Sequence, residues 1–147
     1  MNVSDVIAQF INEMMRNQGG QVELRRGELA GRFNCVPSQI NYVIETRFTP
    51  EHGYIVETRR GGGGFIRISR VSGGAALTMH ALNAIGDSID GGSARMFLVN
   101  LVSGEALNAK TAAIILAATS DTALRAAQAG DRDRIRAAVL KACLLAV

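Results

Sequence analysis

Residues 59–64 read Arg-Arg-Gly-Gly-Gly-Gly, and this segment lies between two runs that are typical of β-strands. The run before it, residues 53–58, is rich in β-branched and aromatic residues. The run after it, residues 65–71, alternates with period 2 and places Ile66 and Ile68 on one face. The sequence therefore predicts a β-hairpin whose tip carries no side chain other than arginine.

Such a tip suits contact with DNA. Glycine lets a backbone approach another surface closely, and arginine is the side chain favoured in a narrow, electronegative minor groove. A flexible surface turn is an equally good interpretation of the hairpin taken alone. The candidate wing residues are Arg59, Arg60, Gly61, Gly62, Gly63 and Gly64.

Positive charge is concentrated at this hairpin. Residues 59–70 hold four arginines and no acid, whereas residues 71–147 hold seven basic and six acidic residues. The formal net charge of +3 permits a polyanionic partner without requiring one. A hydrophobic content of 48% excludes a disordered chain, and 147 residues suffice for one compact domain or two small ones.

Cysteines and histidines are too few for a disulfide framework or a metal site. Cys35 and Cys143 are expected to be reduced, and His52 and His80 have no Cys or His neighbour at metal-ligand spacing. No signal peptide is apparent, and the apolar runs are far shorter than the roughly 20 residues of a membrane span. We therefore expect a cytoplasmic protein with no metal, no cofactor and no membrane contact.

Helical periodicity dominates the first fifty residues. Ser4 is a plausible N-cap for a first helix that ends at Gly19-Gly20, and a short strand follows at residues 21–24. A second helix is predicted over residues 26–33. Pro37 fits the first position of a third helix that runs to about Arg47.

The chain changes character near residue 72. Everything after it is alanine-rich with helical periodicity, so we predict a mixed domain over residues 1–72 and an all-helical domain over residues 76–147. The apolar stripes of this second domain need a partner, which favours a dimerisation domain. The clearest stripe is Ile135, Ala138, Val139, Ala142, Cys143 and Ala146.

The second and third helices have the residue types of a helix-turn-helix. Ala30 is small where the two helices would cross, and four residues later Asn34 lies in a turn that usually needs a left-handed backbone. Ile40 and Val43 provide apolar contacts of the third helix with the second. This spacing matches a DNA-binding helix-turn-helix.

The third helix has a polar face opposite its core face. Ile40, Val43 and Ile44 fall in one narrow sector, and the opposite side is rich in hydrogen-bonding groups suited to base edges and phosphates. For an isolated helix a merely solvated face would be favoured. Followed by the arginine-tipped hairpin, the same face indicates a winged helix-turn-helix within an α+β protein. The candidate DNA-contacting residues are Ser38, Gln39, Asn41, Tyr42 and Thr46.

Five segments together carry a family resemblance. They are residues 35–44 (Cys-Val-Pro-Ser-Gln-Ile-Asn-Tyr-Val-Ile), 46–48 (Thr-Arg-Phe), 53–57 (Gly-Tyr-Ile-Val-Glu), 60–64 (Arg-Gly-Gly-Gly-Gly) and 66–68 (Ile-Arg-Ile). This pattern closely resembles the CtsR family, bacterial repressors of class III stress (heat-shock) genes that include those of the Clp protease machinery. The resemblance covers roughly residues 3–71; further on, only the helical pattern and residues 132–137 look similar.

The resemblance implies a homodimeric winged-helix repressor that binds tandemly repeated operator half-sites in double-stranded DNA. It places Arg60 in the minor groove beside the glycines, and it implicates those glycines in the loss of DNA on heating. In relatives, a protein-arginine kinase and the Clp machinery act on the repressor. This makes Arg60 a candidate phosphorylation site.

Two other function classes compete with DNA binding. An enzyme with a phosphate-binding loop at residues 61–64 is disfavoured, because a strand rather than a helix follows the glycines and no Gly-Lys-Ser/Thr is present. We therefore expect that this protein is not an enzyme. A winged helix that binds RNA or another protein, without operator specificity, stays open as the alternative.

Overall fold

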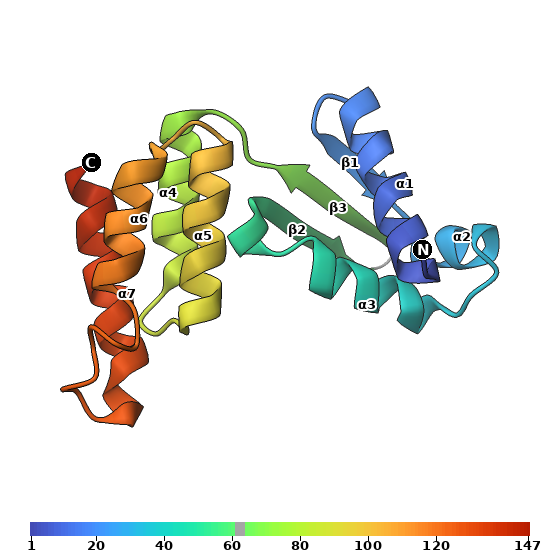
Figure 1. Cartoon of the computed structure of the whole chain (residues 1–147). Helices are drawn as coiled ribbons and strands as arrows, with labels where there is room; N and C mark the ends of the chain where they lie inside the picture. The colour runs from blue at the N-terminus through green and yellow to red at the C-terminus, as the bar shows by residue number, and fades with distance from the viewer. Residues whose placement is uncertain (61–63) are drawn as a thin grey trace. The chain divides into compact units, whose positions relative to one another are not determined.

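The computed structural model describes residues 1–60 and 64–147 and divides the chain into two compact units (Figure 1). The first unit holds Met1–Thr49 and Tyr54–Val71. The second holds Ser72–Val147 together with the short segment Pro50–Gly53. Each unit is described by itself.

The first unit combines three helices with an antiparallel sheet, which in the described residues has three strands in the order β1-β3-β2. The register pairs Leu24 with Ile66 on one side of β3 and Thr58 with Ile66 on the other. The predicted helix-turn-helix and hairpin are therefore confirmed. The elements are α1 (Val3–Asn17), β1 (Gln21–Leu24), α2 (Arg26–Arg32), α3 (Pro37–Arg47), β2 (Tyr54–Arg59) and β3 (Phe65–Arg70).

The start of α1 differs from the prediction. Asn2, not Ser4, is the N-cap: the Asn2 side chain accepts a hydrogen bond from the Asp5 backbone N–H at 2.9 Å, and the Asp5 carboxylate accepts one from the Asn2 N–H at 3.3 Å. Such a capping box needs an acidic or amide residue three positions after the cap. Asp5 supplies it for Asn2, whereas Ile7 would occupy that position for Ser4.

The turn between α2 and α3 follows the predicted chemistry. Asn34 has a φ of 51°, in the left-handed region, and the Cys35 N–H donates to the Ala30 carbonyl at 2.9 Å. Pro37 occupies the first turn of α3, where its missing N–H leaves no donor unsatisfied. Helix α2 ends at Arg32, one residue before the predicted end.

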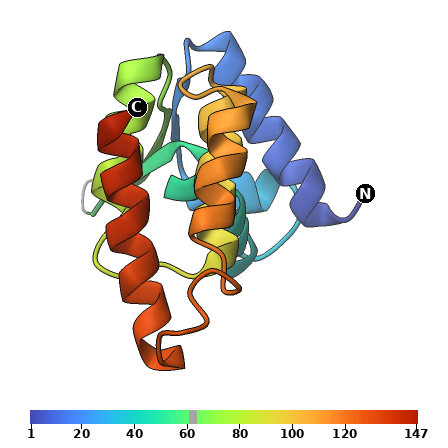
Figure 2. The same ribbon diagram turned by 60° about the vertical axis from the view of Figure 1, so that its left-hand side comes forward.

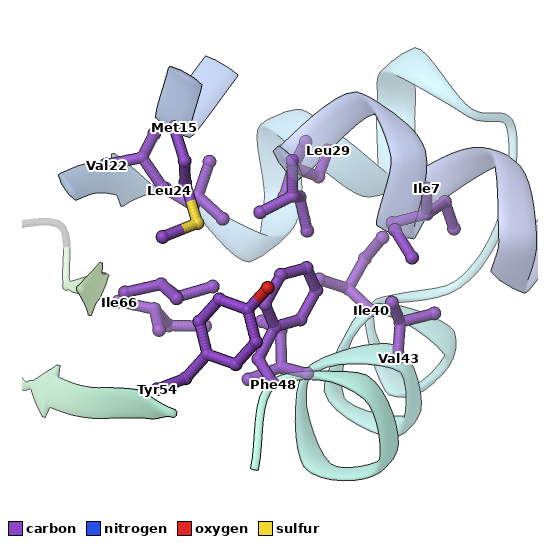
Figure 3. Packing of buried hydrophobic residues seen from close by; sticks show 14 of the residues in the cluster. Ile7, Met15, Val22, Leu24, Leu29, Ile40, Val43, Phe48, Tyr54 and Ile66 are labelled. Atoms are coloured by element: carbon purple, nitrogen blue, oxygen red, sulfur yellow. The ribbon is translucent and has the colours of Figure 1, made fainter. Parts of the chain in front are cut away.

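A single apolar cluster holds this unit together. Figure 3 shows side chains from the helices and the sheet converging on it, and Ile40, Val43 and Ile68 are completely buried. The rings of Phe48 and Tyr54 meet edge to face, with centroids 5.0 Å apart. The predicted inward face of α3 (Ile40, Val43 and Ile44) and of β3 (Ile66 and Ile68) is confirmed.

The second unit is all-helical over residues 72–147, which confirms the predicted helical class of the C-terminal domain. Helix α5 packs against the other three helices of this stretch (Figures 1 and 2). The short 3-10 helix η1 (Pro50–His52) packs against α4 and α5. The helices are α4 (Gly74–Ile85), α5 (Gly91–Ser103), α6 (Ala109–Ala118) and α7 (Ala129–Ala146).

The buried face of α7 is not the predicted stripe. Ile135 is 37% exposed, and Ala138, Ala142 and Ala146 are also exposed. Leucines carry more apolar surface than alanines, so the face that holds them gains more from burial. The residues of α7 that are buried are Arg136, Ala137, Leu140 and Leu144.

Arg136 is 1% exposed, which is unusual for an arginine. Its Nε donates to the Thr119 carbonyl at 2.8 Å and its Nη1 to the Ile89 carbonyl at 3.1 Å. Its terminal nitrogens also bind the carboxylates of Asp121 and Asp133. The guanidinium therefore joins α7 to the segments that precede α5 and follow α6.

Candidate nucleic-acid interface

Ser38, Tyr42 and Thr46 are exposed on α3, and Tyr42 is 56% exposed. The Thr46 hydroxyl donates back to the Tyr42 carbonyl at 2.7 Å within the helix. Hydroxyl groups can hydrogen-bond to phosphates or base edges, and an exposed aromatic ring can contact a thymine methyl group. This part of the predicted face is open to a ligand.

Gln39 and Asn41 are only half-exposed, because neighbouring helices engage both amides. The Gln39 Nε2 donates to the hydroxyl of buried Ser4 in α1 at 2.7 Å. The Asn41 Oδ1 accepts a hydrogen bond from the Nε of Arg26 in α2. A helical wheel shows neither contact, because both partners lie outside α3.

Arg26 is a candidate residue that the sequence analysis missed. It is the first residue of α2, and its side chain reaches Asn41 on the proposed recognition helix. The first helix of a helix-turn-helix crosses the DNA backbone. The pair Arg25-Arg26 at the start of that helix was the available signal.

The wing tip retains its positive charge. Arg59 pairs with Phe65 in the last rung of the β2–β3 ladder, and Arg60 follows immediately. Both are exposed, and within residues 1–60 and 64–147 neither guanidinium has a hydrogen-bond or ion-pair partner. Gly64 has a φ of +26°, and a Cβ there would lie 3.1 Å from the Arg59 carbonyl oxygen, so this position favours glycine. The candidate residues Gly61, Gly62 and Gly63 lie outside the described residues.

The other two arginines of the hairpin are engaged within the sheet. The Arg67 guanidinium lies 2.9 Å from the Glu23 carboxylate and 3.9 Å from that of Glu57, and the hydrogen bond to Glu23 raises the pKa of Arg67. The Arg70 guanidinium donates to the Tyr54 hydroxyl at 3.0 Å. Within residues 1–60 and 64–147, Arg59 and Arg60 are therefore the hairpin arginines whose guanidinium groups have no hydrogen-bond or ion-pair partner.

At the far end of α3, Arg47 pairs with Asp5 at 2.8 Å, and this hydrogen bond lowers the pKa of the Asp5 carboxyl. No group of three or more His, Cys, Asp or Glu side chains in residues 1–60 and 64–147 is placed to hold a metal ion. Cys35 and Cys143 are both free. Among the same residues, no helix is long and apolar enough to span a membrane.

A helix-turn-helix followed by an arginine-tipped hairpin, with a separate helical unit after it, defines a winged-helix DNA-binding regulator. The family model of the CtsR N-terminal HTH domain matches residues 2–72. The family model of the CtsR C-terminal dimerization domain matches residues 75–145. The chain belongs to the CtsR family of transcriptional regulators.

Relatives and a solved structure agree with this assignment. The transcriptional regulator CtsR of Geobacillus stearothermophilus is 42% identical over 147 residues, covering 97% of this chain and 95% of the relative. The regulator of the same name from Staphylococcus aureus (strain USA300) is 41% identical over 146 residues, with the same two coverages. A crystal structure of CtsR in complex with a 26-base-pair DNA duplex aligns with a TM-score of 0.81 at 40% identity, covering 99% of this chain and 97% of that one.

Proposed function

We propose that this protein is a homodimeric repressor of stress-response genes, including those of the Clp protease and chaperone machinery. It binds tandem operator half-sites in duplex DNA and leaves them on heating. Residues 1–72 form its DNA-binding domain and residues 76–147 its dimerisation and regulatory domain. The observation that carries the proposal is a pair of exposed arginines, Arg59 and Arg60, at the end of a hairpin that follows a helix-turn-helix. Neither has a hydrogen-bond or ion-pair partner in the part of the chain that the structure describes.

In this proposal α3 enters the major groove. Ser38, Tyr42 and Thr46 offer exposed groups to phosphates and bases, and Gln39 and Asn41 add amides held by adjacent helices. Recognition helices of this motif read base edges in that groove. The relative solved with a DNA duplex supports the orientation, since the two chains share their fold over nearly their whole lengths.

The wing then follows the minor groove. Arg60 inserts its guanidinium, Arg59 neutralises a nearby phosphate, and residues 61–64 let the backbone approach the sugars. Ordering a glycine backbone costs about 1–2 kcal/mol per residue in entropy, and this cost grows with temperature. A four-glycine segment ordered only on DNA would therefore weaken binding as temperature rises.

Regulation by covalent modification belongs to the same proposal. Arg60 is exposed and would be accessible to a protein-arginine kinase. A phosphate on its guanidinium would replace a cation with anionic oxygens facing the DNA phosphates, and repulsion would release the operator. The Clp machinery is the proposed destination of the released repressor.

A salt-dependent gel shift with the full-length protein tests the DNA-binding step. Arg60→Ala should lose most specific binding to promoter duplex, and Arg60→Lys should recover little, because an ammonium is costly to desolvate in a narrow groove. Arg16→Ala, an exposed arginine on α1, is the matched control and should bind normally. Equal binding by all variants would contradict the wing assignment, and tighter binding to structured RNA than to duplex would favour an RNA-binding module instead.

Heat release is tested separately by stiffening the tip. Gly62→Pro or Gly63→Val should weaken binding at ordinary temperature if the added side chain blocks close approach to DNA, or reduce its dependence on temperature if a backbone with fewer accessible states loses less entropy on binding. The measurement is the operator dissociation constant between growth and heat-shock temperatures. Identical temperature curves for wild type and both variants would remove the glycines from the mechanism.

A further inference from the structure

Arg26 and Asn41 form a side-chain pair that bridges the two helices of the helix-turn-helix. The Arg26 Nε donates to the Asn41 Oδ1, and both side chains are half-buried. A guanidinium has donors and no acceptor. The amide oxygen, not the amide nitrogen, must therefore face Arg26, so the orientation of this amide is dictated by chemistry.

The Gln39 amide shows that a hydrogen-bond partner does not always fix the orientation of an amide on α3. Its partner is the hydroxyl of Ser4 at 2.7 Å, and a hydroxyl can either donate or accept. The Gln39 amide could rotate by half a turn and keep a hydrogen bond to Ser4. Only the Arg26 contact fixes which atom of an amide is turned outward.

The consequence is a set of donors without a competing acceptor. With Oδ1 engaged, Asn41 offers the two hydrogens of Nδ2. The Nη1 and Nη2 groups of Arg26 have no hydrogen-bond partner among residues 1–60 and 64–147, so they remain available as further donors. An asparagine that reads adenine in the usual bidentate way needs its oxygen for the adenine N6 amino group. Here that oxygen is already bound.

We propose that Arg26 is a positioning residue that sets the base specificity of Asn41. By holding the amide oxygen, it makes Asn41 select guanine, whose N7 and O6 are both acceptors, over adenine, whose N7 acceptor adjoins a donor. The terminal nitrogens of Arg26 bind a backbone phosphate where α2 crosses the DNA, so phosphate contact and base reading are coupled through one side chain. This inference rests on the proposed operator binding by α3.

The test is selection of bound sequences from a randomised duplex library by the full-length protein. Wild type should prefer guanine over adenine at one position by about tenfold, and Asn41→Ala should lose the preference at that position. Arg26→Lys keeps the charge, but its one nitrogen cannot occupy both the Nε position beside the amide oxygen and the terminal position that would bind a phosphate. The amide can then rotate, adenine is accepted, and the guanine-to-adenine ratio falls towards one while other positions keep their preferences.

Two further variants make the readout specific. Arg32→Lys replaces the arginine at the other end of α2, whose guanidinium lies 4.5 Å from the centre of the Phe10 ring, and it should leave every preference unchanged. Asn41→Asp retains the contact with Arg26 but has no donor, so the guanine preference should disappear. Replacing the selected guanine with 7-deazaguanine removes one acceptor and should weaken wild-type binding but not that of Asn41→Asp.

The possible failures are distinguishable. If the wild-type protein enriches no sequence, operator recognition itself is wrong and the inference falls with it. If wild type enriches an operator but Arg26→Lys keeps the guanine preference, or lowers binding equally for all sequences, Arg26 contributes charge alone and only the inference is overturned. A guanine preference that survives in Asn41→Asp overturns it independently of how Arg26→Lys folds.

Discussion

Arginine is used in opposite ways at the wing tip and at the junction of α6 and α7. Arg60 is exposed and has no partner among the described residues, whereas Arg136 is 1% exposed and bonded to two carbonyls and two carboxylates. A guanidinium whose donors are unused is available to a ligand. One whose donors are satisfied internally fixes the fold, and the surroundings, not the residue type, decide between these roles.

The largest expected effect on stability comes from Arg136→Ala. It leaves the buried carbonyls of Ile89 and Thr119 without donors and creates a cavity. The free energy of unfolding of the second unit should therefore fall by about 3 kcal/mol. Asp121 and Asp133 are 75% and 50% exposed and can rehydrate, which limits the cost. Urea denaturation followed by circular dichroism measures the change.

Arg134→Ala is the matched control for this change. Arg134 lies two residues away on α7, is 69% exposed and pairs with Asp131 on the surface. Its removal should alter stability by no more than about 0.5 kcal/mol. Comparable losses for the two variants would show that burial does not distinguish these arginines.

A smaller effect is expected at Asp90, the N-cap of α5, which adjoins the carbonyl that Arg136 binds. Its carboxylate accepts a hydrogen bond from the Ser93 N–H at 2.8 Å, and this bond lowers its pKa below the ordinary 3.8. Asp90→Ala should cost about 1 kcal/mol at neutral pH. Because the folded-state pKa is lowered, the stabilisation is present above pH 3.8 and is lost as pH falls through the lowered value.

Asp90→Asn separates capping from charge. Asparagine caps helices about as well as aspartate but does not titrate in this range. The variant should remain stable at neutral pH and lose part of the acid sensitivity, as followed by thermal melting between pH 2.5 and 7. Unchanged acid sensitivity would assign the effect to other carboxylates, such as Asp5.

The smallest effect on stability is expected for Arg67→Ala, an arginine intermediate between the two extremes. Its ion pairs with Glu23 and Glu57 join all three strands, but they are open to solvent. We expect the loss of stability to be smaller than that caused by Asp90→Ala. It should shrink further at high salt, because exposed ion pairs are screened. Thermal melting at low and high salt measures it. A loss of stability independent of salt would point instead to packing of the Arg67 side chain on the Phe65 ring, whose centre lies 5.6 Å from the guanidinium carbon.

Local features of this fold could be predicted from the sequence. The left-handed Asn34, Pro37 at the start of α3 and the alternation of Ile66 and Ile68 each depend on residues close in the chain. The N-cap of α1 was missed because Ser4 and Asn2 are both good capping residues, and only the position of Asp5 distinguishes them.

Long-range polar contacts could not be predicted in this way. Asn41 and Arg26 are 15 residues apart, and Arg136 reaches the Ile89 carbonyl across 47 residues. Periodicity assigns an arginine on a helix to the solvated face, since it contains no information about acceptors elsewhere in the chain. The same limit explains why the exposure of Ser38, Tyr42 and Thr46 on α3 could be predicted, while the engagement of Gln39 and Asn41 by neighbouring helices could not.

The burial of Arg136 also provides a chemical measure of opening. A reagent that modifies guanidinium groups reaches exposed arginines such as Arg60 directly, but it reaches Arg136 only when the second unit opens. When reclosing is faster than modification, the labelling rate of Arg136 reports the equilibrium population of open molecules; when it is slower, it reports the opening rate. Mass spectrometry of one peptide would then follow the unfolding of this unit in a crude cell extract, without purification.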